Sequence, residues 1–535
     1  MLKVQLLRSV STQSLLLLPN PFLSGHWNEP FTIWPRHTLF EKQNYSTQPN
    51  PAPVDTKPVP DPTEVPFSRK STFPPGFFFG TASSAYQSEG AAFKYGKGES
   101  NWDHFTHTCP EKIKDRSNGD SAVDAYHNYE DHVTTMKELG LNAYKFSIAW
   151  TRLFPNGKKS KGVNDQGIQF YKNLIKELKS KGIEPIVTLF HWDVPQALED
   201  EYHGFLSDKI INDFKDYAEA CYEAFGDEVK YWITLNEPWT FTTGGYVKGT
   251  FPPGKTDNAG ADPYKVAHNL LLAHSVAVKI YRDKYQANQK GKIGITLNDI
   301  CMVPYSDNPD DKLAAQRASD FILGWFMDPI TKGEYPQSMQ VQIAQRLPEF
   351  PKEEAEILKG SYDFLGLNYH TSNYAQAILS AGVPPPNGNP SYSTDSRCHL
   401  TTQRNGIHIG AQTASRWHFI YPKGLEDTLT YIKDRYKNPD IFVTGNGTTD
   451  DNNPMGEPLN DENRIDALRD HLKSLQSAMK ANVNVKGFFL ASLYDTFQWD
   501  SGYTARFGIY HVNFKDGLAS CPKNSAHWLK KFLKD

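Results

Sequence analysis

The sequence lacks an excess of charge of either sign and any long hydrophobic run. Its 57 basic and 61 acidic residues give a formal net charge of -4, so neither a nucleic-acid-binding surface nor an acidic solvating tail is expected. Near the N-terminus the longest apolar run, Leu15 to Leu18, ends at Pro19, and this is far too short to span a bilayer. We therefore expect neither nucleic acid nor a membrane as a partner.

Cysteine is scarce and never occurs in close pairs, so the spacing typical of zinc ligands is missing. The odd number of cysteines also argues against a fully paired disulfide framework. We expect scattered, buried thiols, and no metal or other cofactor. The five positions are Cys109, Cys221, Cys301, Cys398 and Cys521.

The first 28 residues contain Lys3 and Arg8, four serines and no acidic residue. Such a segment resembles an organellar transit peptide more than a secretory signal, which needs a clean apolar stretch. A plastid is therefore one predicted location, and the cytoplasm and the vacuole are the alternatives. Residues 48–66 follow with seven prolines, which predicts an extended linker. We expect an N-terminal extension over 1–66 and one large domain over 67–535.

Within that domain, short apolar runs alternate with helical patterns, for example at 167–181 and 208–225. Eight such runs are predicted as strands: 77–84, 143–150, 183–190, 229–235, 292–297, 362–368, 441–444 and 485–493. Eight strand–helix units are typical of a single (β/α)8 barrel of the α/β class. The segment at 383–399 is rich in proline and polar residues, which predicts a surface insertion.

The active site of such a barrel lies at the carboxyl ends of its strands, and every predicted strand ends in polar or aromatic residues. These are Gln87, Arg152, His191 with Trp192, Asn236 with Glu237, Asn298 with Asp299, residues 368–370, residues 444–446 and residues 495–499. The fourth strand closes with TLNEPW at 234–239. A glycosidase needs a carboxylic acid to protonate the departing oxygen and a neighbour that holds the sugar 2-hydroxyl. Glu237 and Asn236 fit these roles.

In its context this motif resembles the acid/base motif of glycoside hydrolase family one, and the resemblance covers nearly all of 69–535. It is carried by SAYQSEG at 84–90, FHWDVPQALED at 190–200, RWHFIYPKGL at 416–425 and DTFQWDSGYTARFG at 495–508. The overall likeness is to plant β-glucosidases of specialised metabolism. It implies a small β-glucoside or its aglycone as ligand, Gln87 and His191 as contacts to sugar hydroxyls, Trp499 in the sugar pocket and Trp417 against the aglycone.

The departures from the family pattern bear on its activity. The family's seventh strand ends Thr-Glu-Asn-Gly, and its Glu is the nucleophile, but this chain has Gly445 there. Retaining hydrolysis requires a second carboxylate close to the acid, and glycine has no side chain. Four further positions around the inner sugar subsite also differ from the family: Lys145 for Arg, His370 for Tyr, Gln498 for Glu and Ala491 for Trp.

These changes predict a family member that keeps its acid but has lost or weakened retaining hydrolysis. Three alternatives remain: a working β-glucosidase whose sequence is misread at Gly445, non-retaining chemistry in the same pocket, and a non-catalytic partner of active paralogues, in homo- or hetero-oligomers. With two carboxylates gone, we expect Lys145 to stay cationic and His370 to be able to gain charge near neutral pH.

Overall fold

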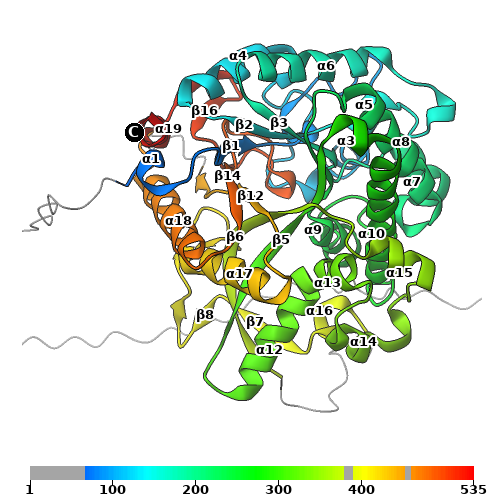
Figure 1. Cartoon of the computed structure of the whole chain (residues 1–535), viewed down its shortest axis with the longest axis vertical. Helices are drawn as coiled ribbons and strands as arrows, with labels where there is room; N and C mark the ends of the chain where they lie inside the picture. The colour runs from blue at the N-terminus through cyan, green and yellow to red at the C-terminus, as the bar shows by residue number, and fades with distance from the viewer. Residues whose placement is uncertain (1–66, 379–389, 452–458, 535) are drawn as a thin grey trace, which may run out of the picture. The chain divides into compact units, whose positions relative to one another are not determined.

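The computed structural model describes residues 67–378, 390–451 and 459–534. Its centre is a closed barrel of eight parallel strands, which pair in the order β12-β14-β1-β2-β3-β4-β5-β6, with β12 also pairing with β6 (Figure 1). The strands are β1 (Phe78–Ala82), β2 (Ala143–Ser147), β3 (Glu184–Phe190), β4 (Tyr231–Asn236), β5 (Lys292–Pro304), β6 (Phe364–Ala377), β12 (Ile441–Asn446) and β14 (Val485–Leu490). Each overlaps one of the predicted runs, so the predicted (β/α)8 barrel is confirmed.

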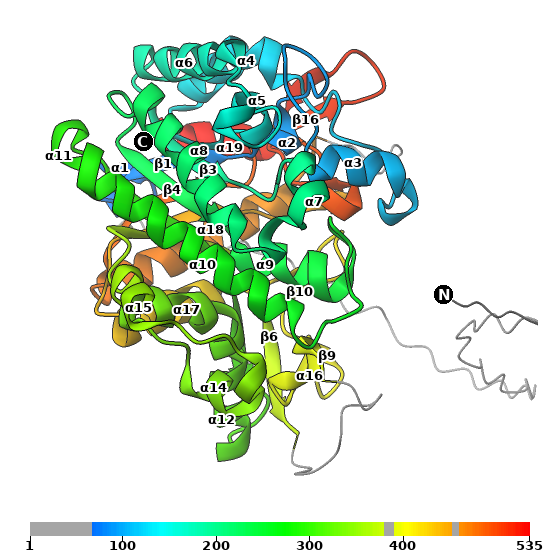
Figure 2. The ribbon, with the colours of Figure 1, turned by 90° about the vertical axis from the view of Figure 1, so that its right-hand side faces the viewer.

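Helices follow the strands along the chain and surround them (Figure 1). The principal ones are α4 (Ala125–Leu139), α6 (Asp165–Ser180), α8 (Lys209–Phe225), α10 (Asp262–Ile280), α13 (Trp325–Lys332), α17 (Pro422–Arg435), α18 (Glu462–Lys480) and α19 (Asn524–Lys534). The predicted helices at 167–181 and 208–225 are α6 and α8, with ends that differ by one or two residues. Figure 2 shows α10 running across the face of the molecule turned to the viewer.

The sequence of α6 explains why it is a helix and which way it faces. Phe170, Leu174 and Leu178 recur every four residues and are all buried, because residues at this spacing share one face of a helix. The preceding outer helix, α4, ends at Gly140, whose φ of 88° is left-handed and whose N–H reaches the carbonyls of the last turn. Glycine adopts this conformation without a steric penalty.

The inside of the barrel is a packed core. Its lower layer contains small and large apolar side chains from seven strands: Ala82, Ala143, Ile186, Ile233, Phe364, Phe442 and Phe489. Interior layers of this kind fill the barrels of this architecture. The interior of the barrel is therefore filled, and any ligand must enter from the carboxyl ends of the strands.

Strands β5 and β6 extend well beyond the barrel and stay paired up to Pro304 and Ala375. An antiparallel strand, β7 (Cys398–Thr401), extends the sheet on the outer side of β6. The insertion predicted at 383–399 lies partly outside the described residues, and its described part is not a simple surface loop. There α16 (Tyr392–Asp395) packs inward, and Asp395 accepts a hydrogen bond from Tyr264 and pairs with Arg346. The polar composition of the segment gave no sign of this buried ion pair.

The two ends of the described barrel lie side by side. Figure 1 shows α1 (Arg69–Thr72) beside α19, and the rings of Phe73 and Phe532 contact each other edge to face at 6.3 Å. The predicted extension over 1–66 lies outside the described residues. The five cysteines are free thiols, with Cys221 and Cys301 buried and the other three partly buried. Across the described part of the chain, no helix is long and apolar enough to cross a membrane.

Candidate active site

A cavity of about 670 Å³ opens at the carboxyl ends of the barrel strands. Eight of the nine predicted site residues line it: Gln87, His191, Glu237, His370, Trp417, Gly445, Gln498 and Trp499. The ninth, Asn236, is buried behind this surface and contacts two of the groups that line the cavity. Its predicted contact with a sugar hydroxyl stays a prediction.

Glu237 sits at the junction between β4 and the short helix α9 (Pro238–Thr243), with a left-handed φ of 45°. Its carboxylate accepts hydrogen bonds from Asn368 Nδ2 at 2.5 Å and from Thr240 Oγ1 at 2.8 Å. Both oxygens are thus held by the protein. Trp192 and Trp499, two other residues of the cavity wall, also have positive φ. Such backbone strain is concentrated at functional sites, where the surrounding structure maintains it.

The Asn236 side chain joins the second, third and fourth strands. Its Oδ1 accepts from Lys145 Nζ at 2.6 Å, and its Nδ2 donates to His191 Nε2 at 3.1 Å. Since Nε2 of His191 accepts, its ring proton is on Nδ1, which has no hydrogen-bond partner among the described residues. This Nδ1 donor is buried and unsatisfied, while the His191 ring itself lines the cavity.

Gly445 lies on β12 directly opposite Asn368 of β6. Its φ is not left-handed, so the backbone here does not require glycine. A Cβ at this position would come within 2.8 Å of Asn368 Oδ1. Asn368 is held there by Thr444, which donates to Oδ1 at 2.8 Å, and by its own bond to Glu237. The Asn368 amide therefore occupies the space into which a side chain at 445 would project.

The charge expected for the inner subsite is partly wrong. Burial lowers the pKa of Lys145 to about 8, and the Glu237 carboxylate opposes this shift. Lys145 is therefore still mostly cationic at pH 7. Burial also lowers the pKa of His370, and the Lys145 charge adds to this, although Glu237 and the Gly447 carbonyl act in the opposite direction. His370 is consequently neutral at pH 7, contrary to the expectation that it could gain charge there.

The wall opposite Glu237 comes from the segments after β1 and β14. Gln87 donates to the Phe497 carbonyl at 2.9 Å and to Gln498 Oε1 at 3.4 Å, while Gln498 donates to Thr496 at 2.9 Å. Trp499 is nearly buried, and its ring lies 5.8 Å from that of His191 in a stacked arrangement. Ala491 also lines the cavity. These side chains form one continuous surface with neutral polar groups and one aromatic face.

The mouth of the cavity includes the predicted Trp417 and other residues that were not assigned a role from the motifs. Trp417 is 53% exposed, and Trp239 donates to the hydroxyl of Tyr392 at 2.5 Å. Lys248 lies 5.6 Å from the centre of the Trp239 ring and lines the cavity as well. Thr240, which donates to the Glu237 carboxylate, was also missed.

Two of the charged groups predicted at the strand ends do not line the cavity. Arg152 is buried and pairs with Glu89 at 2.9 Å, and Asp495 is buried in an ion network with Arg506 and Lys523. Both therefore stabilise the loops around the site. In the part of the chain that the structure describes, no group of three or more His, Cys, Asp or Glu residues could hold a metal ion.

Comparison with known proteins gives matches over this whole region. Residues 69–535 match the family described as Glycosyl hydrolase family 1. Beta-glucosidase 12 of Oryza sativa subsp. indica is 54% identical over 484 residues, which cover 88% of this chain and 94% of the rice protein. Furcatin hydrolase of Viburnum furcatum is 52% identical over 469 residues, which cover 86% of each chain.

Solved structures agree with the sequence relatives. The crystal structure of a rice β-glucosidase has a TM-score of 0.85 at 43% identity, covering 88% of this chain and 100% of that one. A β-glucosidase from the fungus Humicola insolens, in complex with glucose, has a TM-score of 0.83 at 38% identity and covers 86% and 98%. With its closed eight-stranded parallel barrel and this match over 69–535, the chain belongs to glycosyl hydrolase family 1, as a β-glucosidase-like member.

Proposed function

We propose that this chain binds a β-glucoside, or the aglycone of one, in the barrel cavity and has lost ordinary retaining hydrolysis. The observation that carries this proposal is the arrangement at Gly445. The residue beside the acid Glu237 has no side chain, and the Asn368 amide fills the adjacent space. Retaining hydrolysis needs a carboxylate there to form the glycosyl-enzyme.

The expected loss is large. Removing a nucleophile that works as part of a unit costs on the order of 10⁶ in rate, which corresponds to roughly 8 kcal/mol of transition-state stabilisation. Glu237 is held by Asn368 and Thr240, but an acid alone does not supply the missing covalent step. Binding is a separate property, because the His191 and Trp499 rings and the Gln87 and Gln498 side chains all line the cavity.

The ligand class follows from the relatives and from the shape of the site. The likeness to rice Beta-glucosidase 12 and to furcatin hydrolase of Viburnum furcatum supports plant β-glucosides, including those of specialised metabolism, as ligands. The wide mouth with Trp417, Trp239 and Tyr392 supports an aromatic or apolar aglycone, since such ligands stack on flat side chains.

The test combines turnover and binding in the full chain. With dinitrophenyl β-glucoside, we expect unaided hydrolysis to be at least about 10⁴-fold slower than that of a rice β-glucosidase assayed in parallel. We expect calorimetry with phenyl β-glucoside to show binding that weakens at least tenfold in Trp499→Ala. Rapid hydrolysis with net retention would contradict the proposal, and so would the absence of any glucoside binding.

An azide arm separates a missing nucleophile from non-retaining chemistry. Because Asn368 occupies the space beside Gly445, we expect azide to restore little turnover in the native chain and more in Asn368→Ala, with the inverted glycosyl azide as product. Efficient hydrolysis with inversion and no azide would instead identify non-retaining chemistry and overturn the proposed loss of function.

A further inference from the structure

A buried amine that faces the cavity is not used by the function proposed above. Lys145 is 2% exposed, belongs to β2, and lines the cavity. Its Nζ donates to Asn236 Oδ1 at 2.6 Å, and no carboxylate oxygen of the described residues lies within 4.0 Å of it. Burial of a cation without a paired anion is costly, and the amine can avoid the cost by losing its proton.

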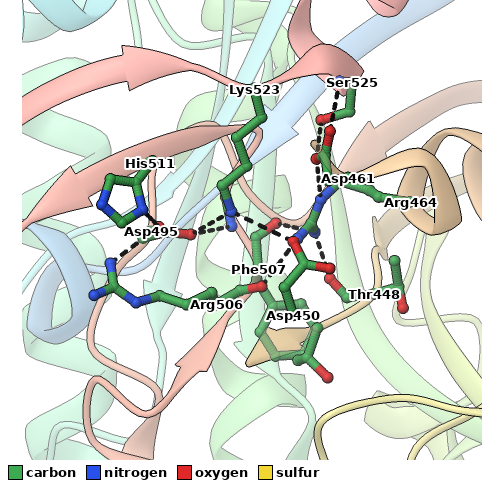
Figure 3. A network of polar contacts seen from close by, with 12 residues as sticks. Thr448, Asp450, Asp461, Arg464, Asp495, Arg506, Phe507, His511, Lys523 and Ser525 are labelled. Carbon is green, nitrogen blue, oxygen red and sulfur yellow. Dashed lines mark hydrogen bonds and ion pairs between the residues drawn. The ribbon is translucent and has the colours of Figure 1, made fainter. Parts of the chain in front are cut away.

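A second buried lysine provides the contrast. Lys523 is 1% exposed, but its Nζ lies 3.1 Å from Asp495 and 3.6 Å from Asp450, as Figure 3 shows. It does not line the cavity. Two lysines that are equally buried thus differ in both respects that matter for reactivity, the presence of a carboxylate partner and contact with the cavity.

The groups that face Lys145 suit an amine that reacts while neutral. With its pKa lowered to about 8, about half of Lys145 is unprotonated at pH 8, against well under 1% of an ordinary lysine. The ionisable groups around it are Glu237 from the end of β4, His191 from the end of β3, and His370 from β6. Burial lowers the pKa of both histidines, and Glu237 is the carboxylate whose charge acts on the amine.

We propose that Lys145 is a nucleophilic amine that forms an imine with a small apolar aldehyde bound in the barrel cavity. The neutral Nζ adds to the carbonyl carbon, and the carbonyl electron pair moves to the oxygen, which takes up the amine proton. A proton from solvent, relayed by the Glu237 carboxylate, then protonates the resulting hydroxyl. The C–O bond breaks, and water leaves while the nitrogen lone pair forms the C=N bond of the protonated imine. The step consumes one proton, releases one water and needs no oxidant or reductant.

The apolar parts of the cavity define the aldehyde. Trp239, Phe251 and Trp417 line the cavity, and a volume of about 670 Å³ admits a ligand the size of a drug molecule. An aromatic aldehyde can place its ring there and its carbonyl toward Lys145. This activity does not depend on glucoside binding or on hydrolysis.

The test is reductive trapping in the full chain. Benzaldehyde and cyanoborohydride are added at pH 8, and peptide mass spectrometry then follows the gain of one benzyl group at each lysine. We expect Lys145 to be modified at least about tenfold faster than Lys523 and faster than the exposed lysines, because more of it is neutral and it is open to the cavity. Lys145 that stays unmodified, or reacts no faster than Lys523, would overturn the proposal.

Two controls make the assignment specific. Lys145→Arg keeps the positive charge and a donor for Asn236 but cannot form an imine, so modification of this peptide should vanish while thermal unfolding stays cooperative. The trapping rate at Lys145 should rise between pH 6.5 and 8.5 and then level off, whereas exposed lysines continue to gain reactivity to about pH 10. Identical pH profiles for both classes would contradict the assignment.

Discussion

At the scale of single residues, the inner subsite depends on a competition for space between two side chains. Asn368 bonds to Glu237 at 2.5 Å and accepts from Thr444 at 2.8 Å, and it can do so because Gly445 presents no Cβ. A Cβ at position 445 would lie 2.8 Å from Asn368 Oδ1, so Asn368 could not keep its present position if residue 445 had a side chain. Glycine at 445 therefore leaves room for the Asn368 amide that holds the Glu237 carboxylate.

Gly445→Ala tests this competition. The new methyl group must displace an amide that is hydrogen-bonded on both sides, so we expect a loss of about 1–2 kcal/mol in the free energy of unfolding. In an Asn368→Ala background the same change should become neutral or stabilising by up to about 1 kcal/mol, because alanine restricts the unfolded chain. Urea denaturation of the four proteins measures the coupling. Additive effects would mean that the two residues do not compete.

Gly445→Glu should restore little hydrolysis. The single revertant has to displace Asn368, and it still lacks the family residues at Lys145, His370 and Gln498. We expect its hydrolysis of dinitrophenyl β-glucoside to remain at least about 10²-fold below that of a rice β-glucosidase, since the catalytic groups act as a unit. Combining it with Lys145→Arg and His370→Tyr should recover more activity than the single change. Full recovery of hydrolysis in the single variant would show that Gly445 alone accounts for the low activity.

Lys145 also gives a pH dependence of stability. Its pKa is about 8 in the folded chain and near 10.5 when unfolded, so the unfolded state binds more protons between these values and stability rises with pH there. Below pH 8 the burial cost is fully present. We expect Lys145→Met to raise the free energy of unfolding by up to about 3 kcal/mol at pH 7, and by much less at pH 10. Denaturation at both pH values measures the difference, and an equal gain at each would contradict it.

The polar and aromatic cavity residues at the strand ends could be predicted from the sequence, because the barrel rule places strand ends at one face. Gln87, His191, Glu237 and Trp499 all line the cavity. The Asn368–Glu237 bond could not be predicted, since it joins residues 131 positions apart and depends on the register of side chains across the barrel. The neutral state of His370 was equally inaccessible, because burial is a property of the folded chain.

At the scale of elements, α10 is fixed to β4 through a buried histidine. His274 is fully buried, and its two ring nitrogens contact Thr234 Oγ1 at 2.6 Å and Ser361 Oγ at 3.0 Å. Burial lowers its pKa to about 3. The strand that carries Glu237 therefore depends on an uncharged imidazole behind it.

His274→Gln should change the acid stability of the chain. The unfolded state binds a proton at His274 below about pH 6.5 and the folded state only near pH 3, so the stability contributed by this group is present at pH 7 and is lost as the pH falls between these values. We expect the variant to lose about 1–3 kcal/mol at pH 7 from broken hydrogen bonds and to show a flatter decline toward pH 4. His527→Gln, at an exposed position of α19, is the matched control. An unchanged acid profile would refute the role of His274.

The ends of two strands could not be predicted from the sequence pattern. All eight strands coincide with apolar runs, but the run predicted at 292–297 continues as β5 to Pro304, and β6 continues to Ala377. These extensions contain polar residues and pair with each other beyond the barrel. Periodicity could not reveal them, because they are stabilised by backbone pairing between segments that are distant in sequence and not by an apolar pattern.

At the scale of the whole molecule, a buried ion network connects the segment after β14 with the C-terminal strands and α18. Figure 3 shows Asp495 between Arg506, His511 and Lys523, and Lys523 in turn beside Asp450, which pairs with Arg464. Asp495 also accepts hydrogen bonds from the backbone N–H groups at 508 and 512. The network holds the segment from which Gln498 and Trp499 reach the cavity.

Asp495→Asn should therefore destabilise the chain and loosen this wall of the cavity. Two buried cations lose their common anion, and breaking a buried pair on one side costs about 3–5 kcal/mol. The midpoint of urea denaturation should fall, while Asp516→Asn at an exposed site should change it little. If Asp495→Asn is as stable as the parent chain, the network does not contribute as described.

The exposure of Trp417 affects the fluorescence of the protein. Its indole is 53% exposed at the cavity mouth, whereas large tryptophans such as Trp102, Trp150, Trp232 and Trp325 are fully buried. Water relaxes around an exposed indole and shifts its emission to longer wavelength, and an aromatic ligand stacked on the ring would remove that water. Binding of an aromatic ligand in the cavity should therefore register as a blue shift of intrinsic fluorescence that disappears in Trp417→Phe.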